Sequence, residues 1–296
     1  MMQVLNGSLV ALITPMIKGG EIDYESLEKL IDWHIDSGTN GIVSVGTTGE
    51  SATLNVEEHL KVIKHTVDFA KSRIPIIAGT GANSTSEAIE LTKESKNLGA
   101  DFALIVTPYY NKPSQNGLIR HYTKIADEVD IPQILYNVPS RTACDLLPSS
   151  VDILSNHKNI IGIKEAVGTK NRINDLISIS KANKNFLLFS GDDPSFLNMI
   201  QNGGDGVISV AANVVPSLIS EICSLARNLK YDDAYNINAG LENLYELLFV
   251  ESNPVPVKWM LYKMKYVQNS IRLPLVQLDE KYHENVINEM LRLKLI

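Results

Sequence analysis

Eight short apolar runs, each followed by a longer amphipathic segment, constrain the fold of this chain more than any other feature of its sequence. Runs that are apolar almost without interruption are typical of parallel strands with both faces covered. We therefore predict strands over residues 8–13, 41–45, 74–78, 101–106, 133–136, 160–164, 186–190 and 206–210.

The segments between these runs have the spacing of amphipathic helices. Residues 24–37 place three apolar side chains and His34 on one face, and Gly38 follows as a helix stop. Residues 56–70 and 84–98 repeat the pattern. Eight strand–helix units predict a closed parallel barrel of the (β/α)8, or TIM, type. An open doubly wound sheet is the alternative, although no GxGxxG motif opens a helix to favour it.

The pattern changes after the last predicted strand, where helices follow one another without strands between them. They are predicted over residues 215–229, 232–249, 257–267 and 279–293. The first of these would close the barrel. We therefore expect a catalytic barrel over residues 1–229 and a C-terminal helical region over 230–296 that packs on it.

Composition and charge exclude several classes of protein. The formal net charge of -7 provides no basic surface for nucleic acid or anionic lipid. No apolar run approaches the roughly 20 residues of a membrane span, and the N-terminus lacks the basic start of a signal peptide. Cys144 and Cys223 lie far apart and outside any CxxC or zinc pattern, which is typical of a reduced compartment. We expect a cytoplasmic protein without nucleic-acid or membrane partners.

A lysine ends the sixth predicted strand, where barrels of this type carry their active sites. Lys164 comes directly after the apolar residues 160–163. Apolar surroundings would lower the pKa of this lysine and leave a free amine as a nucleophile. The alternative is a lysine that extends its amine from the strand end into water, which is the more common outcome for an isolated lysine.

Two polar residues at the end of the fifth predicted strand could act with this amine. The phenol of Tyr136 could pass a proton to and from Lys164, although a core tyrosine with a satisfied hydroxyl fits equally well. Arg141 follows in a proline-containing loop and has the donor geometry to bind a carboxylate. A solvated loop arginine is its commoner role.

Two more strand ends carry polar motifs. The second strand ends in Gly46-Thr47-Thr48-Gly49, where glycines permit a sharp turn and threonines present donors to an anion. An ordinary strand-to-helix turn fits as well. Tyr109 and Tyr110 lie between prolines after the fourth strand and form either a rigid packing loop or a phenol delivered to a site.

No metal site is expected. Asp192 and Asp193 follow the seventh strand, but adjacent carboxylates point in different directions. The six histidines show no HxH or HExxH spacing. With no metal expected, the Lys164 amine is left as the electron sink.

Several motifs together carry a family resemblance. They are GIVSVGTTGE at 41–50, PYYNKPSQNG at 108–117, YNVPSRT at 136–142 and IGIKEA at 161–166, followed by SGDD, GVISV and NPVPVKW. From Ser8 to about Leu275 the chain resembles the dihydrodipicolinate synthase / N-acetylneuraminate lyase family. The resemblance implies a lyase without metal or organic cofactor that condenses pyruvate with L-aspartate 4-semialdehyde in the diaminopimelate route to lysine.

The resemblance implies catalytic roles for four residues. Lys164 would form a Schiff base with pyruvate. Tyr136 and Thr47 match two members of the family's proton relay. Tyr110 matches the third member, which reaches into the site of a neighbouring subunit.

Four other residues match substrate-binding positions. Thr48 and its neighbouring amides match the pyruvate carboxylate site, and Arg141 matches the residue that meets the carboxylate of the semialdehyde. Gly191 and Ile208 match positions whose backbone carbonyls lie near the lysine.

The resemblance also implies a homotetramer built from dimers and an inhibitory lysine site at the dimer interface. The matching residues are Ser51, Ala52, His59, Asn83, Glu87 and Tyr109. Val56 departs from the family pattern, because lysine-sensitive relatives often carry histidine there. We expect weakened but persistent inhibition by lysine.

Two alternatives stay open on the sequence. Another pyruvate aldolase of the family, such as a lyase of N-acetylneuraminate or of 2-keto-3-deoxy sugar acids, would usually lack an arginine at position 141. A catalytically silent metabolite-binding relative would lose Lys164 or Tyr136, and both are present.

Overall fold

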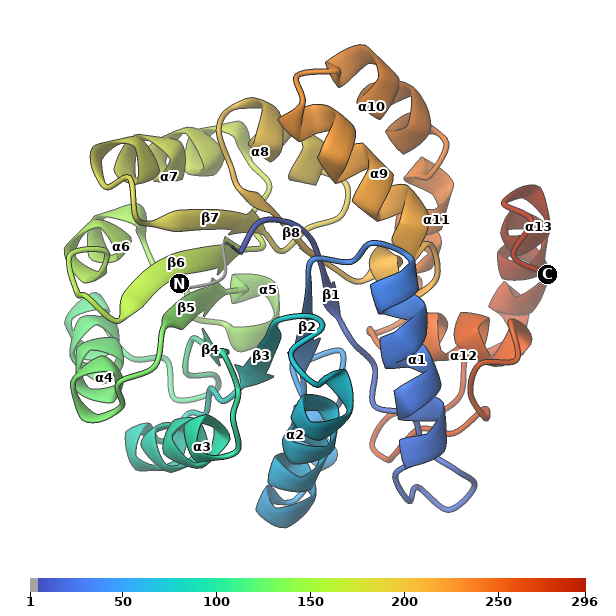
Figure 1. Cartoon of the computed structure of the whole chain (residues 1–296), viewed down its shortest axis with the longest axis horizontal. Coiled ribbons are helices and arrows are strands. Elements are labelled where there is room, and N and C mark those ends of the chain that lie inside the picture. Colours follow the sequence, from blue (N-terminus) through green and yellow to red (C-terminus); the bar gives the residue numbers. More distant parts are fainter. Residues whose placement is uncertain (1–4) are drawn as a thin grey trace.

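The computed structural model describes residues 5–296. Eight parallel strands form one closed barrel in sequence order, and β8 pairs with β1 to complete it. Figure 1 shows the strands at the centre with the helices around them. The predicted (β/α)8 barrel is therefore confirmed.

The strands lie within two residues of their predicted bounds. They are β1 (Gly7–Ala11), β2 (Gly41–Ser44), β3 (Ile76–Gly79), β4 (Phe102–Val106), β5 (Gln133–Asn137), β6 (Ile160–Glu165), β7 (Leu187–Ser190) and β8 (Gly206–Ser209).

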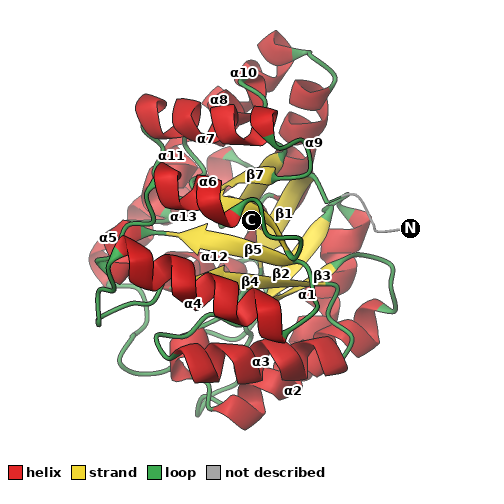
Figure 2. Ribbon diagram, turned by 90° about the vertical axis from the view of Figure 1, so that its left-hand side faces the viewer, coloured by secondary structure: helices red, strands yellow, loops and turns green. Residues whose placement is uncertain are grey.

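The helices form the outer layer that encloses the strands in Figure 2. Those of the barrel are α1 (Tyr24–Asp36), α2 (Val56–Ala70), α3 (Thr85–Asn97), α4 (Gln115–Glu128), α5 (Pro139–Thr142), α6 (Pro148–Leu154), α7 (Lys170–Ala182), α8 (Phe196–Gln201) and α9 (Pro216–Arg227). Short 3-10 turns are η1 (Ser51–Thr53), η2 (Ala211–Asn213) and η3 (Glu280–Tyr282). No helix within the described residues is long and apolar enough to cross a bilayer.

Local sequence signals explain why some helix bounds match the prediction. Helix α2 covers the predicted residues 56–70 because a capping box fixes its start. The Asn55 side chain accepts a hydrogen bond from the Glu58 amide, and the Glu58 side chain accepts one from the Asn55 amide.

The C-terminal helices are α10 (Tyr231–Ala239), α11 (Glu242–Leu247), α12 (Val255–Lys263) and α13 (His283–Arg292), drawn in orange to red in Figure 1. The single helix predicted over 232–249 is wrong, because the chain breaks between α10 and α11. Gly240 caps α10 at this break, and the buried Leu241 starts α11. Glycine is a poor helix former, so the helix ends at Gly240. Leu241 is buried, and a new helix begins after it.

Apolar side chains pack in two layers. One cluster fills the inside of the barrel, and a larger one lies between the strands and the helices. A filled interior is usual for such barrels and leaves the open space at the ends of the strands. Inner residues include Leu9, Phe102, Ile134, Phe189 and Ile208.

A β-bulge in β6 decides which side chains face inward. Gln133 pairs with Ile160, but the next residue of β5, Ile134, pairs with Gly162, so Ile161 is an extra residue in β6. An extra residue re-aims the side chains that follow it. Beyond the bulge Tyr136 is opposite Lys164, both on the inner face.

A buried ion pair joins the C-terminal region to the loop after β2. The Lys258 amine donates to the Glu50 carboxylate, and the two side chains are 4% and 1% exposed. Arg272 adds a partly buried pair with Glu58 at 2.7 Å. The C-terminal helices thereby pack on the mouth of the barrel.

Replacing Lys258 by Met should strongly destabilise the protein, because Glu50 would remain buried without its cation. Loss of one partner of a buried pair costs about 3–5 kcal/mol. Urea unfolding measures this loss. The matched control is Lys281→Met, which removes an exposed pair with Asp279 and should leave the unfolding midpoint unchanged. Equal midpoints for the two variants would contradict a stabilising role for the buried pair.

Candidate active site

A cavity of about 720 Å³ opens at the C-terminal ends of the strands. Six of the predicted site residues line it together: Thr47, Thr48, Tyr136, Arg141, Lys164 and Gly191. They come from the ends of β2, β5, β6 and β7, so the barrel brings together residues that lie far apart in the sequence.

Lys164 lies at the base of this cavity and is only 4% exposed. Burial lowers the pKa of its amine to about 7; the Arg141 charge lowers it too, and the Asp193 carboxylate opposes the shift. A substantial fraction of the amine is therefore uncharged at neutral pH, as a nucleophile requires. The Nζ atom lies 4.4 Å from the centre of the Tyr136 ring.

Gly191 leaves the space that the lysine side chain occupies. A Cβ atom at this position would lie 2.9 Å from Cε of Lys164. A side chain here would push the Lys164 side chain aside, so a glycine directly after β7 allows the amine to keep its place.

Tyr136 stays protonated at neutral pH. Burial raises the pKa of its phenol, while the Arg141 charge and the Thr47 hydroxyl partly offset the shift. A protonated phenol beside a partly deprotonated amine can both donate and accept a proton, which is what acid–base catalysis needs.

A strained turn brings Thr47 and Thr48 to the cavity. Val45 has a φ of 55°, in the left-handed region that a β-branched residue rarely adopts. Gly79 makes room for this turn, because a Cβ there would lie 2.3 Å from the Val45 carbonyl oxygen. The strained residue lies two positions before Thr47.

Asn253 is a site residue that the sequence interpretation missed. Its Nδ2 atom donates to Oγ1 of Thr48 at 2.9 Å, so the threonine O–H is free to donate into the cavity. The buried Oδ1 atom of Asn253 has no partner within residues 5–296 and can accept from a ligand. Phe249, Glu251 and Ser252 of the same loop also line the cavity. The only sequence signal was the NPVPVKW motif, which indicates the family and no role for this asparagine.

Arg141 lies on α5 at the cavity rim. Its side chain is exposed and its guanidinium makes no hydrogen bond within the described part of the chain. A free guanidinium beside the lysine can bind a carboxylate through two parallel hydrogen bonds.

Asp192 and Asp193 point to different partners. Asp193 is buried and accepts from the Ser209 hydroxyl and from the amides of Val210 and Ala211. Asp192 accepts from Ser195. Within residues 5–296 no three His, Cys, Asp or Glu side chains come together as metal ligands would.

Two predicted site residues do not line this cavity. Tyr110 is 88% exposed, and Ile208 is fully buried inside the barrel. The single chain alone gives the Tyr110 phenol no contact with Lys164.

A second cavity of about 280 Å³ adjoins the first. Five of the six predicted lysine-site residues line it, and Asn83 does not; the five are Ser51, Ala52, His59, Glu87 and Tyr109. Val56 lines it too and is 49% exposed. Thr47 and Arg141 line both cavities, so the two spaces share walls.

The Lys164 amine should titrate near pH 7, whereas the pKa of the exposed Lys124 amine is raised by its hydrogen bond with Glu128. Competitive labelling with acetic anhydride across a pH series, read by peptide mass spectrometry, measures each midpoint. In Arg141→Ala the Lys164 midpoint should move to higher pH, because loss of a nearby positive charge favours the ammonium form. The control Arg120→Ala, on the exposed face of α4, should not move it. An unchanged midpoint in Arg141→Ala would refute this electrostatic account.

Comparison with known proteins gives a consistent result. The model of the dihydrodipicolinate synthetase family matches residues 4–292. The 4-hydroxy-tetrahydrodipicolinate synthase of Saccharophagus degradans is 54% identical over 283 residues, which cover 96% of this chain and 97% of that relative.

Two solved structures carry relevant ligands. The chloride-inhibited dihydrodipicolinate synthase of Acinetobacter baumannii, solved with pyruvate, superposes with a TM-score of 0.96 at 50% identity and covers 99% of this chain and 100% of that one. The enzyme of Cyanidioschyzon merolae, solved with lysine bound, has a TM-score of 0.94 at 34% identity and covers 99% of both chains.

Proposed function

The chain belongs to the dihydrodipicolinate synthetase family, and we propose on this premise that it condenses pyruvate with L-aspartate 4-semialdehyde. This is the reaction of a 4-hydroxy-tetrahydrodipicolinate synthase, a step in the diaminopimelate route to lysine. The family indicated by the sequence motifs is confirmed. The observation that carries the proposed reaction is the buried amine of Lys164 beside the Tyr136 phenol.

The first half of the reaction takes place on Lys164. Its free amine attacks the keto carbon of pyruvate and gives a carbinolamine, which loses water to form an imine. Tyr136 passes the protons that these steps need, because the Lys164 amine lies over its ring, 4.4 Å from the ring centre. Loss of a methyl proton then gives an enamine, whose electrons the protonated imine had accepted.

The pyruvate carboxylate binds at the turn after β2. The Thr48 hydroxyl donates to it, since Asn253 occupies the acceptor side of this hydroxyl. Thr47 lies on the same wall beside Tyr136 and belongs to the proton path.

The second substrate enters past Arg141. The guanidinium binds the carboxylate of the semialdehyde and places its aldehyde over the enamine, which attacks it to form the new carbon–carbon bond. The amine of the second substrate then displaces Lys164 and closes the ring. Gly191 and Ile208 contribute backbone carbonyls near the lysine.

The enzyme works as a homotetramer built from dimers. Support comes from Tyr110, which is 88% exposed and has a φ of 74°. Its side chain does not line the active-site cavity of its own subunit. In a dimer this phenol enters the partner's site and completes the proton relay.

Lysine binds in the second cavity and inhibits the enzyme. The cavity offers the Glu87 carboxylate for an amine, together with the Tyr109 phenol, whose pKa burial and the Glu87 charge raise. Asn83 does not line the cavity but follows Ala82, which does, and its backbone carbonyl accepts a hydrogen bond from the Asn111 side chain. Lysine bound in the second cavity acts on the active site through Thr47 and Arg141, because these two residues line both cavities.

Sodium borohydride should trap pyruvate covalently on Lys164, seen as a mass increase on the peptide that contains it. Lys164→Met should trap nothing. Tyr136→Phe keeps the ring but removes the proton carrier, so turnover should fall about 10²- to 10⁴-fold. The assay couples the condensation to the reductase that consumes its product and follows the nicotinamide absorbance. The control Tyr262→Phe changes an exposed tyrosine and should keep full activity.

Failure of pyruvate to form an adduct in the wild-type protein would sink the proposed reaction. Adduct formation without turnover on aspartate semialdehyde, but with turnover on a sugar aldehyde, would instead identify another aldolase of the family.

Saturating L-lysine should lower the turnover rate of the wild-type enzyme. Val56→His should lower the lysine concentration that gives half of the effect, because it adds a polar contact at the cavity wall. The measurement is the coupled assay across a lysine series. A rate independent of lysine in both proteins would contradict this part of the proposal.

A further inference from the structure

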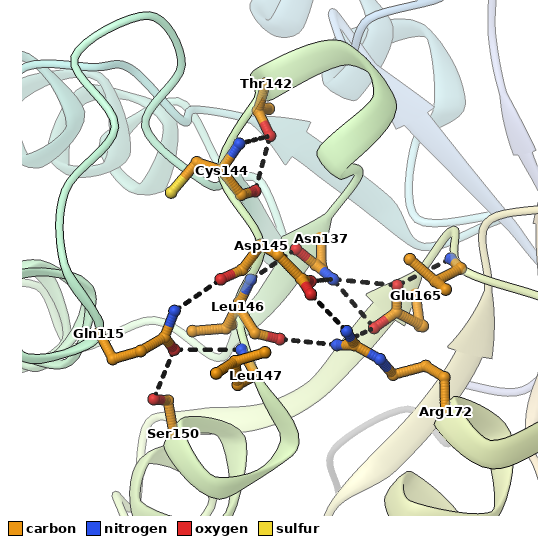
Figure 3. A network of polar contacts seen from close by, with 11 residues as sticks. Gln115, Asn137, Thr142, Cys144, Asp145, Leu146, Leu147, Ser150, Glu165 and Arg172 are labelled. Atoms are coloured by element: carbon orange, nitrogen blue, oxygen red, sulfur yellow. Dashed lines mark hydrogen bonds and ion pairs between the residues drawn. The ribbon is translucent and has the colours of Figure 1, made fainter. Parts of the chain in front are cut away.

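A buried polar network lies directly behind the two catalytic side chains. Beyond the β6 bulge Tyr136 and Lys164 face the cavity, while the next pair in register, Asn137 and Glu165, faces outward. Figure 3 shows this outer pair joined to Asp145 and to Arg172 of α7. The reaction proposed above uses none of these four side chains.

Asn137 closes the chain segment that follows it into a compact loop. Its Oδ1 atom accepts from the Leu146 amide at 2.9 Å, nine residues further along the chain. Its Nδ2 atom donates to Asp145 at 2.8 Å and to both oxygens of Glu165 at 3.1 Å. One side chain at the end of β5 thus holds the far end of the loop.

Arg172 ties the same loop end to β6. Its guanidinium donates to Asp145 at 2.5 Å, to the Leu146 carbonyl at 2.9 Å and to Glu165 at 3.4 Å. The Arg172 side chain is 11% exposed and that of Glu165 fully buried, so solvent screens the network weakly.

The Glu165 carboxylate is arranged for its ionised form. Burial raises its pKa to about 7, and the Val167 amide, Asn137 and Arg172 oppose the rise, whereas Asp145 adds to it. Its hydrogen-bond partners within residues 5–296 are all donors, so a protonated carboxyl would find no acceptor among them. The carboxylate therefore acts as an anchor for donors from three chain segments.

The loop that the network closes carries the residue proposed to bind the second substrate. Between Asn137 and Leu146 lie Val138 and Arg141, which line both cavities. Inside the loop the Thr142 hydroxyl donates to the Val138 and Cys144 carbonyls. Outside the loop, the Gln115 side chain donates to the Asp145 carbonyl at 2.7 Å and so holds the far end of the loop.

We propose that Asn137, Asp145, Glu165 and Arg172 form a positioning network that sets Arg141 over Lys164 and so determines how well the second substrate binds. The network fixes both ends of the loop to β5 and β6, the strands that supply Tyr136 and Lys164. The Arg141 guanidinium makes no hydrogen bond within residues 5–296, and the Arg141 amide donates only to Val138 of the same loop, so the place of this side chain depends on the loop. This inference rests on the proposed function for the role of Arg141.

The test compares Arg172→Gln and Asp145→Asn with the control Arg120→Gln. Both network variants should raise the KM for aspartate semialdehyde about 5- to 100-fold, because a small displacement of a binding group is costly. Borohydride trapping of pyruvate on Lys164 should stay within about 2-fold of wild type, because the inner face is untouched. Backbone amides of residues 138–146 should exchange hydrogen faster in both variants. In the double variant, the fold-increase of the KM for aspartate semialdehyde should be smaller than the product of the two single increases, as is usual for members of one network.

Two outcomes would overturn the proposal. One is a folded Arg172→Gln or Asp145→Asn protein whose semialdehyde KM matches that of Arg120→Gln. The other is loss of pyruvate trapping in proportion to the KM effect, which would make Lys164 the group that the network places. Asp145 is 35% exposed, so Asp145→Asn carries the test if Arg172→Gln does not fold.

Failure of the proposed function would look different. A wild-type enzyme without turnover on the semialdehyde would refute that activity, and the hydrogen-exchange comparison would still decide whether the network holds residues 138–146.

Discussion

Removing an ammonium group from water costs several kcal/mol. This barrel buries the amine of Lys164 at its mouth and so imposes that cost on the charged form. Within residues 5–296 Lys164 forms no ion pair that would keep it charged; the acid that influences its pKa, Asp193, accepts hydrogen bonds from a hydroxyl and two amides. The amine consequently gives up its proton near neutral pH. That uncharged nitrogen explains the residues around it. Gly191 leaves room for the lysine side chain, and the Tyr136 ring lies beside the amine. The charge of Arg141 at the rim helps to lower the pKa of the amine.

The division between reacting and supporting groups follows from strand geometry. Side chains alternate across a strand, so one bulge in β6 is enough to send Lys164 inward and Glu165 outward. The inner face then holds groups that are incompletely hydrogen-bonded, as a site that must bind a ligand requires. The outer face holds Asn137 and Glu165, which each make several hydrogen bonds, as a scaffold requires.

The fold was predictable where local and global signals agreed. The capping box at Asn55 fixed the start of α2, whereas the break at Gly240 escaped because apolar spacing continues across it. Thr47, Tyr136 and Lys164 were predictable because each ends an apolar strand. Asn253 was not, because it meets Thr48 across 205 residues of sequence and only the folded C-terminal region brings them together. The bulge at Ile161 was equally invisible, since β-branched runs carry no mark of register.

The closed loop between Asn137 and Leu146 has an implication for how such enzymes diversify. A segment that is tied at its two ends can exchange the residues in its middle without unravelling the strands beside it. New specificity for the incoming aldehyde can therefore arise by substitutions within this short stretch while the imine chemistry below stays intact. The residues that react lie on the strands and the residues that bind the second substrate lie on the loop, so one set can change by mutation without the other.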